Sequence, residues 1–361
     1  MEKNRAGHAP KDQETVKAVS GHIYGFSYLR AVACVAIIIL HVAYSAALMF
    51  GGSITQTQNI VSMIVVNCMM WAVPCFIMVT GALLLNKARK ITYRKLFGQY
   101  ILRVFGALVF FGMVFRIFDM VMDKELISLL GFLKGFYEIF TGTGWSHLWY
   151  LYLLIGLYLL LPFYKKIAAH SGTNEMKYLL AVYLIFLSLL PLLQMGNVYT
   201  GFYIHVSTIY PFYLFCGYAV YSGIIKPGKA LSAALAAIGT VCIAALTAVR
   251  WIGDYAVMEQ LWGYSSIFVI LQAVGIFSLF LDMKEEGFTF FKKILTRLDQ
   301  CSFGVYLIHM LFVRLIIRYM QFNPYTNGGI LAFIGLILGV LLISWLVTWV
   351  LRKIPALKKI V

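Results

Sequence analysis

Long apolar stretches occupy most of the sequence, and they limit the possible folds more than any other feature does. A helix needs about 20 apolar residues to cross the hydrocarbon core of a bilayer, which is roughly 30 Å thick. The sequence therefore predicts an all-α fold, a polytopic transmembrane helical bundle of about ten spans. The expected spans are residues 26–50, 60–86, 98–122, 147–165, 177–195, 203–222, 229–250, 262–281, 302–321 and 329–351.

The composition agrees with a membrane protein. Of the 361 residues, 61% are hydrophobic and 12% are charged. A soluble globular protein carries about 45–50% apolar and about 25% charged residues, so this chain cannot cover itself with a water-facing surface. The first apolar stretch is longer than the roughly 7 to 15 apolar residues of a signal peptide, and we expect it to stay as the first helix.

The charged residues are distributed unevenly along the chain. The net charge is +16, from 30 Lys and Arg against 14 Asp and Glu. A nucleic-acid-binding protein with such a charge would carry its basic residues on one exposed face. Here 22 of the 30 basic residues fall in the two tails and in every second connection between spans. By the positive-inside rule, both termini are cytoplasmic, and no nucleic-acid partner is expected.

The chain is expected to form one folded unit without internal repeats. A polar cytoplasmic tail, residues 1–25, precedes the transmembrane domain, residues 26–351. A short basic cytoplasmic tail, residues 352–361, follows it. The connection at 282–301 carries charges of both signs, which is typical of a solvated cytoplasmic connector.

The longest outward connection, residues 123–146, contains an amphipathic apolar piece at residues 127–140. A segment of this length is more typical of an interfacial or re-entrant helix than of a span. Its position on the outward side suits a lid over an outward-facing cavity.

Ionisable residues are rare inside the expected spans, and the first span holds the clearest pair, Arg30 and His41. Since a charge at the bilayer centre costs about 3 kcal/mol even on the mildest scale, such residues are functional candidates. Eleven residues turn a helix through three full turns and about 20°, so both side chains share one face, about 16 Å apart along the axis. Arg30 lies near the cytoplasmic end, where a structural arginine also reaches the interface. His41 either bonds to another helix or, as a neutral imidazole, accepts a proton.

The fourth expected span opens with His147, Trp149 and Tyr150. A belt of aromatic residues at the membrane interface explains Trp149 and Tyr150 without any function. His147 is not explained in this way and is therefore a candidate site residue.

The ninth expected span carries a second polar group near its cytoplasmic start. Ser302, Tyr306 and His309 are spaced so that all three can face one interior groove. Hydroxyl-bearing and small residues also help helices to pack in lipid, so a structural role remains open for this group.

The third expected span carries charges near both ends. Near the outer end, Arg116 and Asp119 are three residues apart and are expected to pair with each other. Near the cytoplasmic start, Arg103 forms a basic cluster with Arg94 and Lys95, which the positive-inside rule also explains. Asp119 is the only carboxylate in the expected spans, and this scarcity argues against a cation-coupled transporter.

The cysteines are not arranged for a metal site or for disulfides. Their spacing matches neither a zinc site nor a secreted disulfide framework, so we expect no metal and treat them as buried hydrophobic residues. They are Cys34, Cys68, Cys75, Cys216, Cys242 and Cys301.

Four motifs occur in order along the chain: the Arg30 to His41 spacing and the stretches 76–81, 147–151 and 302–309. Taken together, they resemble the motifs of the acyltransferase 3 family of polytopic membrane O-acyltransferases. The resemblance covers essentially the whole chain. The chain departs from the family at one point. Many relatives carry two arginines three residues apart, and here Tyr100 stands in place of the first of them, while Arg103 matches the second. Some relatives append an extracellular hydrolase-like domain, which we do not expect in the ten residues that follow the last span.

The resemblance implies an activity, its substrates and its site residues. Members of the family move an acyl group, usually acetyl, from cytoplasmic acyl-CoA to a hydroxyl of an outward-facing glycan or lipid-linked saccharide. The implied catalytic residues are His41, as general base or transient acyl acceptor, and Arg30. The implied acyl-CoA-binding residues are Arg30, Arg94, Lys95 and Arg103, which would hold the CoA phosphates. The expected acceptor-binding or supporting residues are His147, Trp149, Tyr150, Arg116, Ser302, Tyr306 and His309.

Two other classes of function remain open. A transporter or exporter of a small polar or glycolipid substrate would use the same His and Arg residues for recognition, and a receptor or scaffold would show no catalysis. Each of these is a multi-pass protein of the cell membrane in contact with lipid, and we expect a bacterial cytoplasmic membrane.

Overall fold

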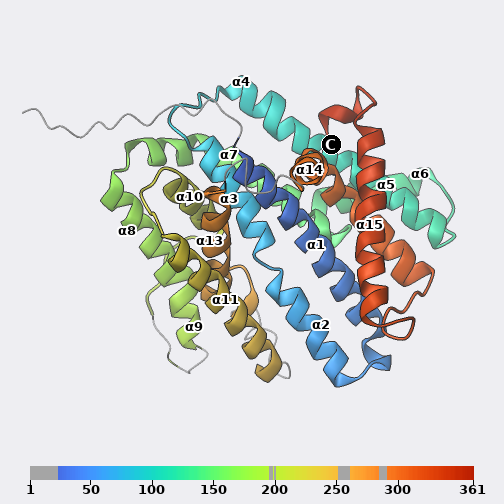
Figure 1. Ribbon diagram of the computed structural model, residues 1–361. Coiled ribbons are helices and arrows are strands. Elements are labelled where there is room, and N and C mark those ends of the chain that lie inside the picture. Colours follow the sequence, from blue (N-terminus) through green and yellow to red (C-terminus); the bar gives the residue numbers. More distant parts are fainter. Residues whose placement is uncertain (1–22, 195–197, 199–200, 251–260, 284–290) are drawn as a thin grey trace, which may run out of the picture.

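The structure, a computed structural model, describes residues 23–194, 198, 201–250, 261–283 and 291–361. All regular elements in these ranges are helical, which confirms the predicted all-α class (Figure 1). Eight helical segments in the described ranges are long and apolar enough to cross a membrane, so the chain is a multi-pass membrane protein. These segments are Tyr24–Ser53, Gln56–Leu84, Tyr93–Met122, Ser146–His170, Thr173–Leu193, Lys229–Val249, Lys292–Tyr319 and Ile330–Leu351.

Figure 1 shows α1 crossing the middle of the bundle, where it packs against α3, α14 and α15. Short π-helical turns continue or precede several helices, namely η2 (Leu96–Ile101), η4 (Ile185–Leu189) and η6 (Leu315–Tyr319). The helices are α1 (Tyr24–Phe50), α2 (Gln56–Cys68), α3 (Ala72–Leu84), α4 (Tyr93–Lys95), α5 (Leu102–Met122), α6 (Leu129–Thr141), α7 (Trp149–His170), α8 (Thr173–Leu184), α9 (Leu190–Gln194), α10 (Tyr210–Tyr221), α11 (Lys229–Arg250), α13 (Ile267–Leu281), α14 (Lys292–Arg314) and α15 (Ile330–Leu351).

Two of the ten predicted spans are shorter than expected. α10 has 12 residues and α13 has 15. At about 1.5 Å per residue, both fall short of the roughly 30 Å hydrocarbon core. α10 is buried along residues 211–220 and packs against α3, α7 and α13. Because protein rather than lipid surrounds it, α10 does not need the length of a lipid-exposed span.

The second predicted span is divided into two helices, α2 and α3. α2 opens with a capping box, in which the Thr55 side chain accepts from the Gln58 backbone N–H and the Gln58 side chain accepts from Thr55. α3 restarts at Ala72, and Pro74 lies in its first turn, where the missing N–H of proline breaks no helical hydrogen bond. The division brings Met70 and Val73 to the cavities described below.

α3 and α10 approach each other closely at two glycines. A Cβ on Gly81 would lie 1.9 Å from the carbonyl oxygen of Leu214, and one on Gly217 would lie 2.1 Å from that of Met78. Because the obstructing atoms belong to the backbone, neither position has room for a side chain. This contact fixes α3, which forms one wall of the candidate site.

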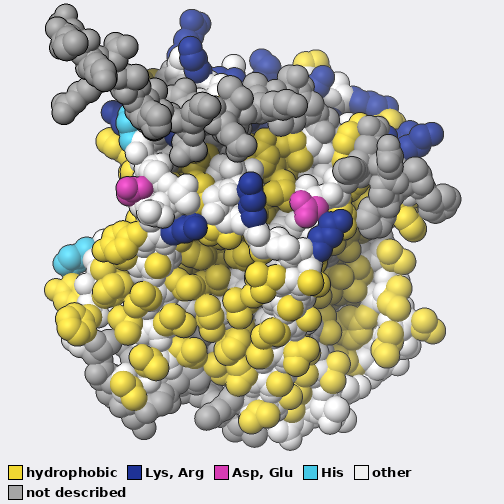
Figure 2. Space-filling view, turned by 60° about the vertical axis from the view of Figure 1, so that its left-hand side comes forward, with side chains coloured by type: hydrophobic (Ala, Val, Ile, Leu, Met, Phe, Trp, Pro, Cys, Tyr) yellow, Lys and Arg dark blue, Asp and Glu magenta, His cyan; other side chains and the backbone are white. Residues whose placement is uncertain are grey.

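Basic residues gather at one end of the bundle. Figure 2 shows Lys and Arg in the upper part of this face, above a broad hydrophobic surface. Lys165 at the end of α7 donates to the Asn86 carbonyl, 2.6 Å away, in the connection after α3. Arg103 near the start of α5 donates to the Val361 carbonyl at 3.0 Å. We call this the basic end, which contains the 85–92 connection, and we call the opposite one the outer end. The positive-inside rule assigns the basic end to the cytoplasm.

The amphipathic piece of the longest outward connection forms α6. Its N-terminus is capped by the Ser128 hydroxyl, which accepts from the Gly131 N–H at 3.2 Å, and it ends at Gly142 in the left-handed region, with φ of 72°. α6 has 13 residues and packs on α5, with Leu129 and Leu130 each 76% exposed. This agrees with an interfacial helix rather than a span. α6 contributes nothing to the lining of the His41 cavity, so the expected lid over that cavity is not formed by α6 in this conformation.

The expected connector at 282–301 is shorter than predicted. α14 begins at Lys292, so residues 292–301 are helical and extend the ninth span toward the basic end. Residues 284–290 of that connector, and residues 1–22 of the expected N-terminal tail, lie outside the described residues.

Candidate active site

Two cavities adjoin each other inside the bundle. The inner cavity, of about 290 Å³, reaches the basic end and is lined mainly from α1, α3, α5, α7 and α14. The outer cavity, of about 390 Å³, is lined by residues of α1, α2, α3, α7 and α14 and contains His41. Four residues line both cavities: Ile37, Val73, Tyr150 and Tyr306. The two cavities are therefore separated by a single layer of side chains.

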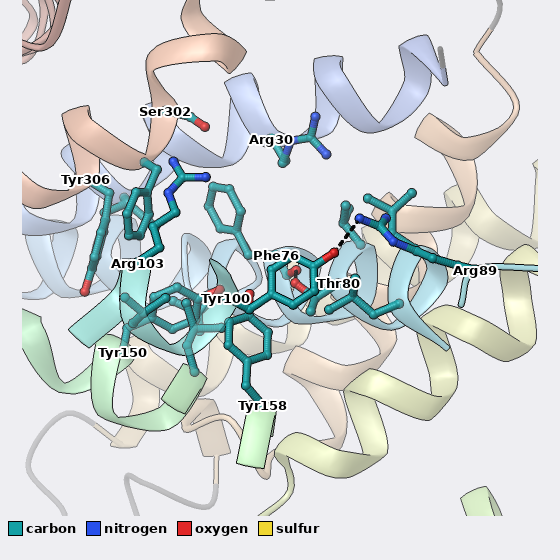
Figure 3. A pocket seen from close by; sticks show the side chains of 18 residues that line it. Arg30, Phe76, Thr80, Arg89, Tyr100, Arg103, Tyr150, Tyr158, Ser302 and Tyr306 are labelled. Atoms are coloured by element: carbon teal, nitrogen blue, oxygen red, sulfur yellow. Dashed lines mark hydrogen bonds between the residues drawn. The ribbon is translucent and has the colours of Figure 1, made fainter. Parts of the chain in front are cut away.

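The inner cavity combines arginines with aromatic rings. Figure 3 shows Arg89 and Arg103 approaching it from opposite sides, with Tyr100 between them. Arg89 donates through Nη2 to the Tyr100 hydroxyl at 2.9 Å. The guanidinium of Arg103 lies 5.2 Å from the centroid of the Phe303 ring. Such a cavity suits an anionic ligand that also carries a flat apolar ring.

Arg30 lines the inner cavity and is held by a carboxylate. Its Nε and Nη2 atoms donate to the two carboxylate oxygens of Asp299 at 2.6 and 2.8 Å. Asp299 lies in α14, within a membrane-spanning segment, so the prediction that Asp119 is the only carboxylate in the spans is wrong. The sequence does contain a signal that Asp299 belongs to the site, although not that Arg30 is its partner. Asp299 stands three and seven residues before Ser302 and Tyr306 and shares their helical face.

The predicted basic cluster is divided between two places. Arg103 lines the inner cavity, whereas Arg94 and Lys95 line a separate hollow on the surface of the basic end, beside Thr92. Arg89, in the 85–92 connection, also lines the inner cavity, although its sequence position did not single it out. The structure thus brings Arg30, Arg89 and Arg103 together and leaves Arg94 and Lys95 outside.

His41 and His309 form a hydrogen-bonded pair between α1 and α14. The Nδ1 atom of His41 lies 3.0 Å from Nε2 of His309. Nδ1 of His309 lies 2.7 Å from the Tyr306 carbonyl and 3.2 Å from that of Val305. Carbonyls only accept, so Nδ1 of His309 carries the proton and its Nε2 accepts from Nδ1–H of His41. A neutral His41 is then left with an unprotonated Nε2, and the side chain lines the outer cavity.

His147 stands beside this pair. Its ring centroid is 5.7 Å from that of His309, and its Nε2 is 3.3 Å from the Leu307 carbonyl. The Tyr306 hydroxyl donates to the backbone carbonyl of His147 and so joins α14 to the start of α7. Nδ1 of His147 is buried and has no hydrogen-bond partner within the described part of the chain. Two imidazoles that line the outer cavity, those of His41 and His147, therefore adjoin the buried imidazole of His309.

Comparison with known proteins identifies the family. A family model described as an acyltransferase domain matches residues 23–349, which is nearly the whole chain. The chain belongs to the acyltransferase 3 family of membrane acyltransferases. The family resemblance found in the sequence is thereby confirmed. No curated protein and no solved structure gives a significant match.

The remaining predicted site residues of this acyltransferase fall into two groups. Trp149 lines the outer cavity beside His147, and its neighbour Tyr150 lines both cavities. Ser302 lines the inner cavity and donates to the Asp299 carbonyl at 2.8 Å, and Tyr306 lines both cavities. The predicted common face of Ser302, Tyr306 and His309 thus spreads over both cavities, with His309 fully buried behind His41.

The predicted pair between Arg116 and Asp119 is wrong. Arg116 donates instead to the Glu125 carboxylate at 2.6 Å, and Asp119 accepts from the Trp145 ring N–H at 2.7 Å and pairs with Arg314. Side chains three apart on a helix are neighbours, but here partners on other segments come closer. Arg116 lines a small hollow beneath α6 and not the His41 cavity, so the structure does not bring it to the expected acceptor site.

The described residues contain no group of three His, Cys, Asp or Glu side chains arranged to hold a metal ion. All six cysteines are free, and five of them are buried. The polar side chains that line or adjoin the two cavities include the three arginines, several tyrosines and the three histidines.

Proposed function

We propose that this acyltransferase takes an acyl group, most simply acetyl, from cytoplasmic acyl-CoA and transfers it to a hydroxyl outside the cytoplasm. The acceptor would be a glycan or a lipid-linked saccharide. The proposal rests on one observation, that a cavity with three arginines and a cavity with His41 meet at a single layer of side chains. Substrates that enter from opposite sides of a membrane would meet at one base.

The inner cavity fits acyl-CoA as the donor. CoA carries several phosphates, which guanidinium groups bind through charge-assisted hydrogen bonds. In the described ion pairs, Arg89 and Arg103 have no Asp or Glu partner, whereas Arg30 is neutralised by Asp299. We therefore assign the main phosphate contacts to Arg89 and Arg103. Arg103 is nevertheless engaged, because its Nη2 donates to the main-chain oxygen of Val361 at 3.0 Å. The rings of Tyr100 and Tyr158, with centroids 5.8 Å apart, offer an apolar surface to the adenine or the pantetheine arm.

His41 supplies the reactive nitrogen in this mechanism. Its unprotonated Nε2 takes the proton of the acceptor hydroxyl while the hydroxyl oxygen attacks the thioester carbonyl. The new C–O bond forms, the C–S bond breaks, and the proton passes to the departing CoA sulfur. In the second route that the sequence leaves open, Nε2 attacks the thioester carbonyl first, the C–S bond breaks, and CoA leaves as the thiolate. The acceptor hydroxyl then attacks the acyl group on Nε2, the C–N bond breaks, and the hydroxyl proton passes to the CoA thiolate. Either route needs the same tautomer of His41.

The location follows from the donor. Acyl-CoA is made in the cytoplasm, and the positive-inside rule places the basic end on that side. We propose a cell membrane, and specifically a bacterial cytoplasmic membrane, as the site of action.

Acyl-CoA binding and release of free CoA thiol by the purified protein in detergent test the proposal. Transferases commonly lose the acyl group slowly to water when no acceptor is present. The wild-type protein is expected to bind acetyl-CoA and release thiol, and His41→Ala to bind acetyl-CoA with similar affinity but lose the release. His170→Ala is the matched control, because His170 is an exposed histidine at the end of α7.

Two results would contradict this assignment. One is a folded wild-type protein that binds no acyl-CoA, and the other is a His41→Ala variant that releases thiol at the wild-type rate. Because two cavities in series also suit a transporter, flux of a saccharide or glycolipid across vesicles without any acyl donor would favour that second function.

A further inference from the structure

A short turn after α3 sets the point from which Arg89 reaches the inner cavity. The Arg89 N–H donates to the Asn86 carbonyl at 3.1 Å and closes a four-residue turn, residues 86–89, which we call the Asn86 turn. The Asn86 side chain accepts from the Ala88 N–H at 2.9 Å within this turn. Lys87, Ala88 and Lys90 are exposed, so the turn has little packing of its own to fix it.

Lys165, near the basic end of α7, holds the Asn86 turn from outside. Its Nζ donates to the Asn86 carbonyl at 2.6 Å, so the Lys165 ammonium and the Arg89 N–H share one carbonyl oxygen. Nζ also donates to the Leu84 carbonyl at 3.2 Å, at the C-terminus of α3. A cation suits this place, because the last carbonyls of a helix have no partner within the helix and carry partial negative charge. Lys165 thus ties the end of α3 to the first residue of the turn.

The same helix also supports the side chain of Arg89. Tyr158 precedes Lys165 by seven residues, or two helical turns, so both project from one face of α7. The rings of Tyr158 and Tyr100 have centroids 5.8 Å apart, and the Tyr100 hydroxyl accepts from Nη2 of Arg89 at 2.9 Å. Figure 3 shows Tyr100 between Arg89 and Tyr158. One face of α7 therefore supports Arg89 at its backbone and at its guanidinium.

We propose that Lys165 is a positioning residue of the donor site, which fixes the Asn86 turn and thereby aims Arg89 at the phosphates of acyl-CoA. The inference rests on the proposed function, since it needs acyl-CoA in the inner cavity. Lys165 is not among the residues that line this cavity, so it acts on the ligand through Arg89. An arginine that is already held in place loses less conformational freedom when it binds a ligand, which increases the affinity.

The test is a titration of the full-length protein in detergent with acetyl-CoA. Lys165→Met removes both hydrogen bonds and keeps a long unbranched side chain. Lys166→Met is the matched control, because it removes the same charge from the adjacent, exposed residue. Both substitutions are also combined with Arg89→Gln, and thermal unfolding checks that each variant is folded.

The expected result is a loss of affinity that depends on Arg89. Lys165→Met should weaken acetyl-CoA binding about tenfold, the lower end of the range for removing a group that orients a binding side chain in metal sites. Lys166→Met should change the affinity less than about twofold, because salt screens exposed charges. In the Arg89→Gln protein, Lys165→Met should also change the affinity less than about twofold, since Lys165 then has no arginine to position.

Two results would overturn the inference and leave the proposed function standing. One is equal affinity of folded Lys165→Met and Lys166→Met for acetyl-CoA. The other is an effect of Lys165→Met that is as large in the Arg89→Gln protein as in wild type, because a general loss of stability acts equally in both. If Lys165→Met does not fold, Lys165→Gln, which keeps an uncharged N–H donor, replaces it in the same comparisons. A folded wild-type protein that binds no acetyl-CoA would remove the proposed function and the inference with it.

Discussion

Replacement of His309 by leucine tests the hydrogen-bonded pair that we place at the centre of catalysis. His309 is fully buried and lines neither cavity, so it would act on the reaction only through His41. Leucine has a similar volume but accepts no hydrogen bond, so Nδ1–H of His41 loses its partner at 3.0 Å. His41 then keeps only its backbone contact with Ile37, so its ring is held less strictly and the tautomer with the proton on Nε2, which blocks the base, becomes more populated.

The size of the effect follows from this single contact. A buried hydrogen bond contributes about 0.5–1.5 kcal/mol net to stability. In metal sites, removing the group that orients a functional histidine lowers the metal affinity or the activity about 10- to 100-fold, and we take this larger figure as the guide. Each factor of ten in rate corresponds to about 1.4 kcal/mol, so an effect of about 1.4–2.8 kcal/mol on the barrier is expected. We therefore predict that His309→Leu lowers kcat about 10- to 100-fold. KM for acyl-CoA should change less than about twofold, because the inner cavity is untouched.

The assay is CoA thiol release at varied acetyl-CoA concentrations, with thermal unfolding in detergent as the measure of folding. His309→Gln is the rescue variant, because its side-chain carbonyl can accept from Nδ1–H of His41. It should keep at least tenfold more activity than His309→Leu. A His309→Leu variant with wild-type kcat would refute the argument, as would a glutamine variant no better than leucine when both are equally stable.

Two further predictions concern the donor site and the fold. Arg89→Gln should weaken acyl-CoA binding, measured by titration, about 10- to 100-fold, because hydrogen bonds to charged groups contribute about 1.5–3 kcal/mol. Arg94→Gln is the control, since Arg94 lies outside the cavity, and it should change the affinity less than about threefold in the same titration. Gly81→Ala should destabilise the protein by more than about 3 kcal/mol, because the new Cβ would lie 1.9 Å from the Leu214 carbonyl oxygen. Gly156→Ala, with nothing within 4 Å of its Cβ, should be neutral or stabilising by up to about 1 kcal/mol in the same thermal unfolding experiment. Equal stabilities of the two alanine variants would contradict the close helix contact.

The sequence by itself determined the class of the protein and much of its catalytic face. Apolar stretches of membrane-spanning length fixed the helical bundle, and the uneven distribution of Lys and Arg fixed its basic end. Helical periodicity placed Arg30 and His41 on one face of α1, and the structure has both residues lining adjoining cavities. These properties are local, because each depends only on residues within one or two helices.

The tertiary structure decided which helices face each other, and with it the partners of the site residues. Arg30 bonds to Asp299 and His41 to His309, across 269 and 268 residues of sequence. Helical periodicity gives the face of each helix but not its neighbour, so neither the neutralised Arg30 nor the tautomer of His41 was predictable. The short length of α10 could not be predicted for the same reason. α10 does not need the length of a full span only because other helices, rather than lipid, surround it. Side-chain packing between α1 and α14 is thus what turns two polar helical faces into a site.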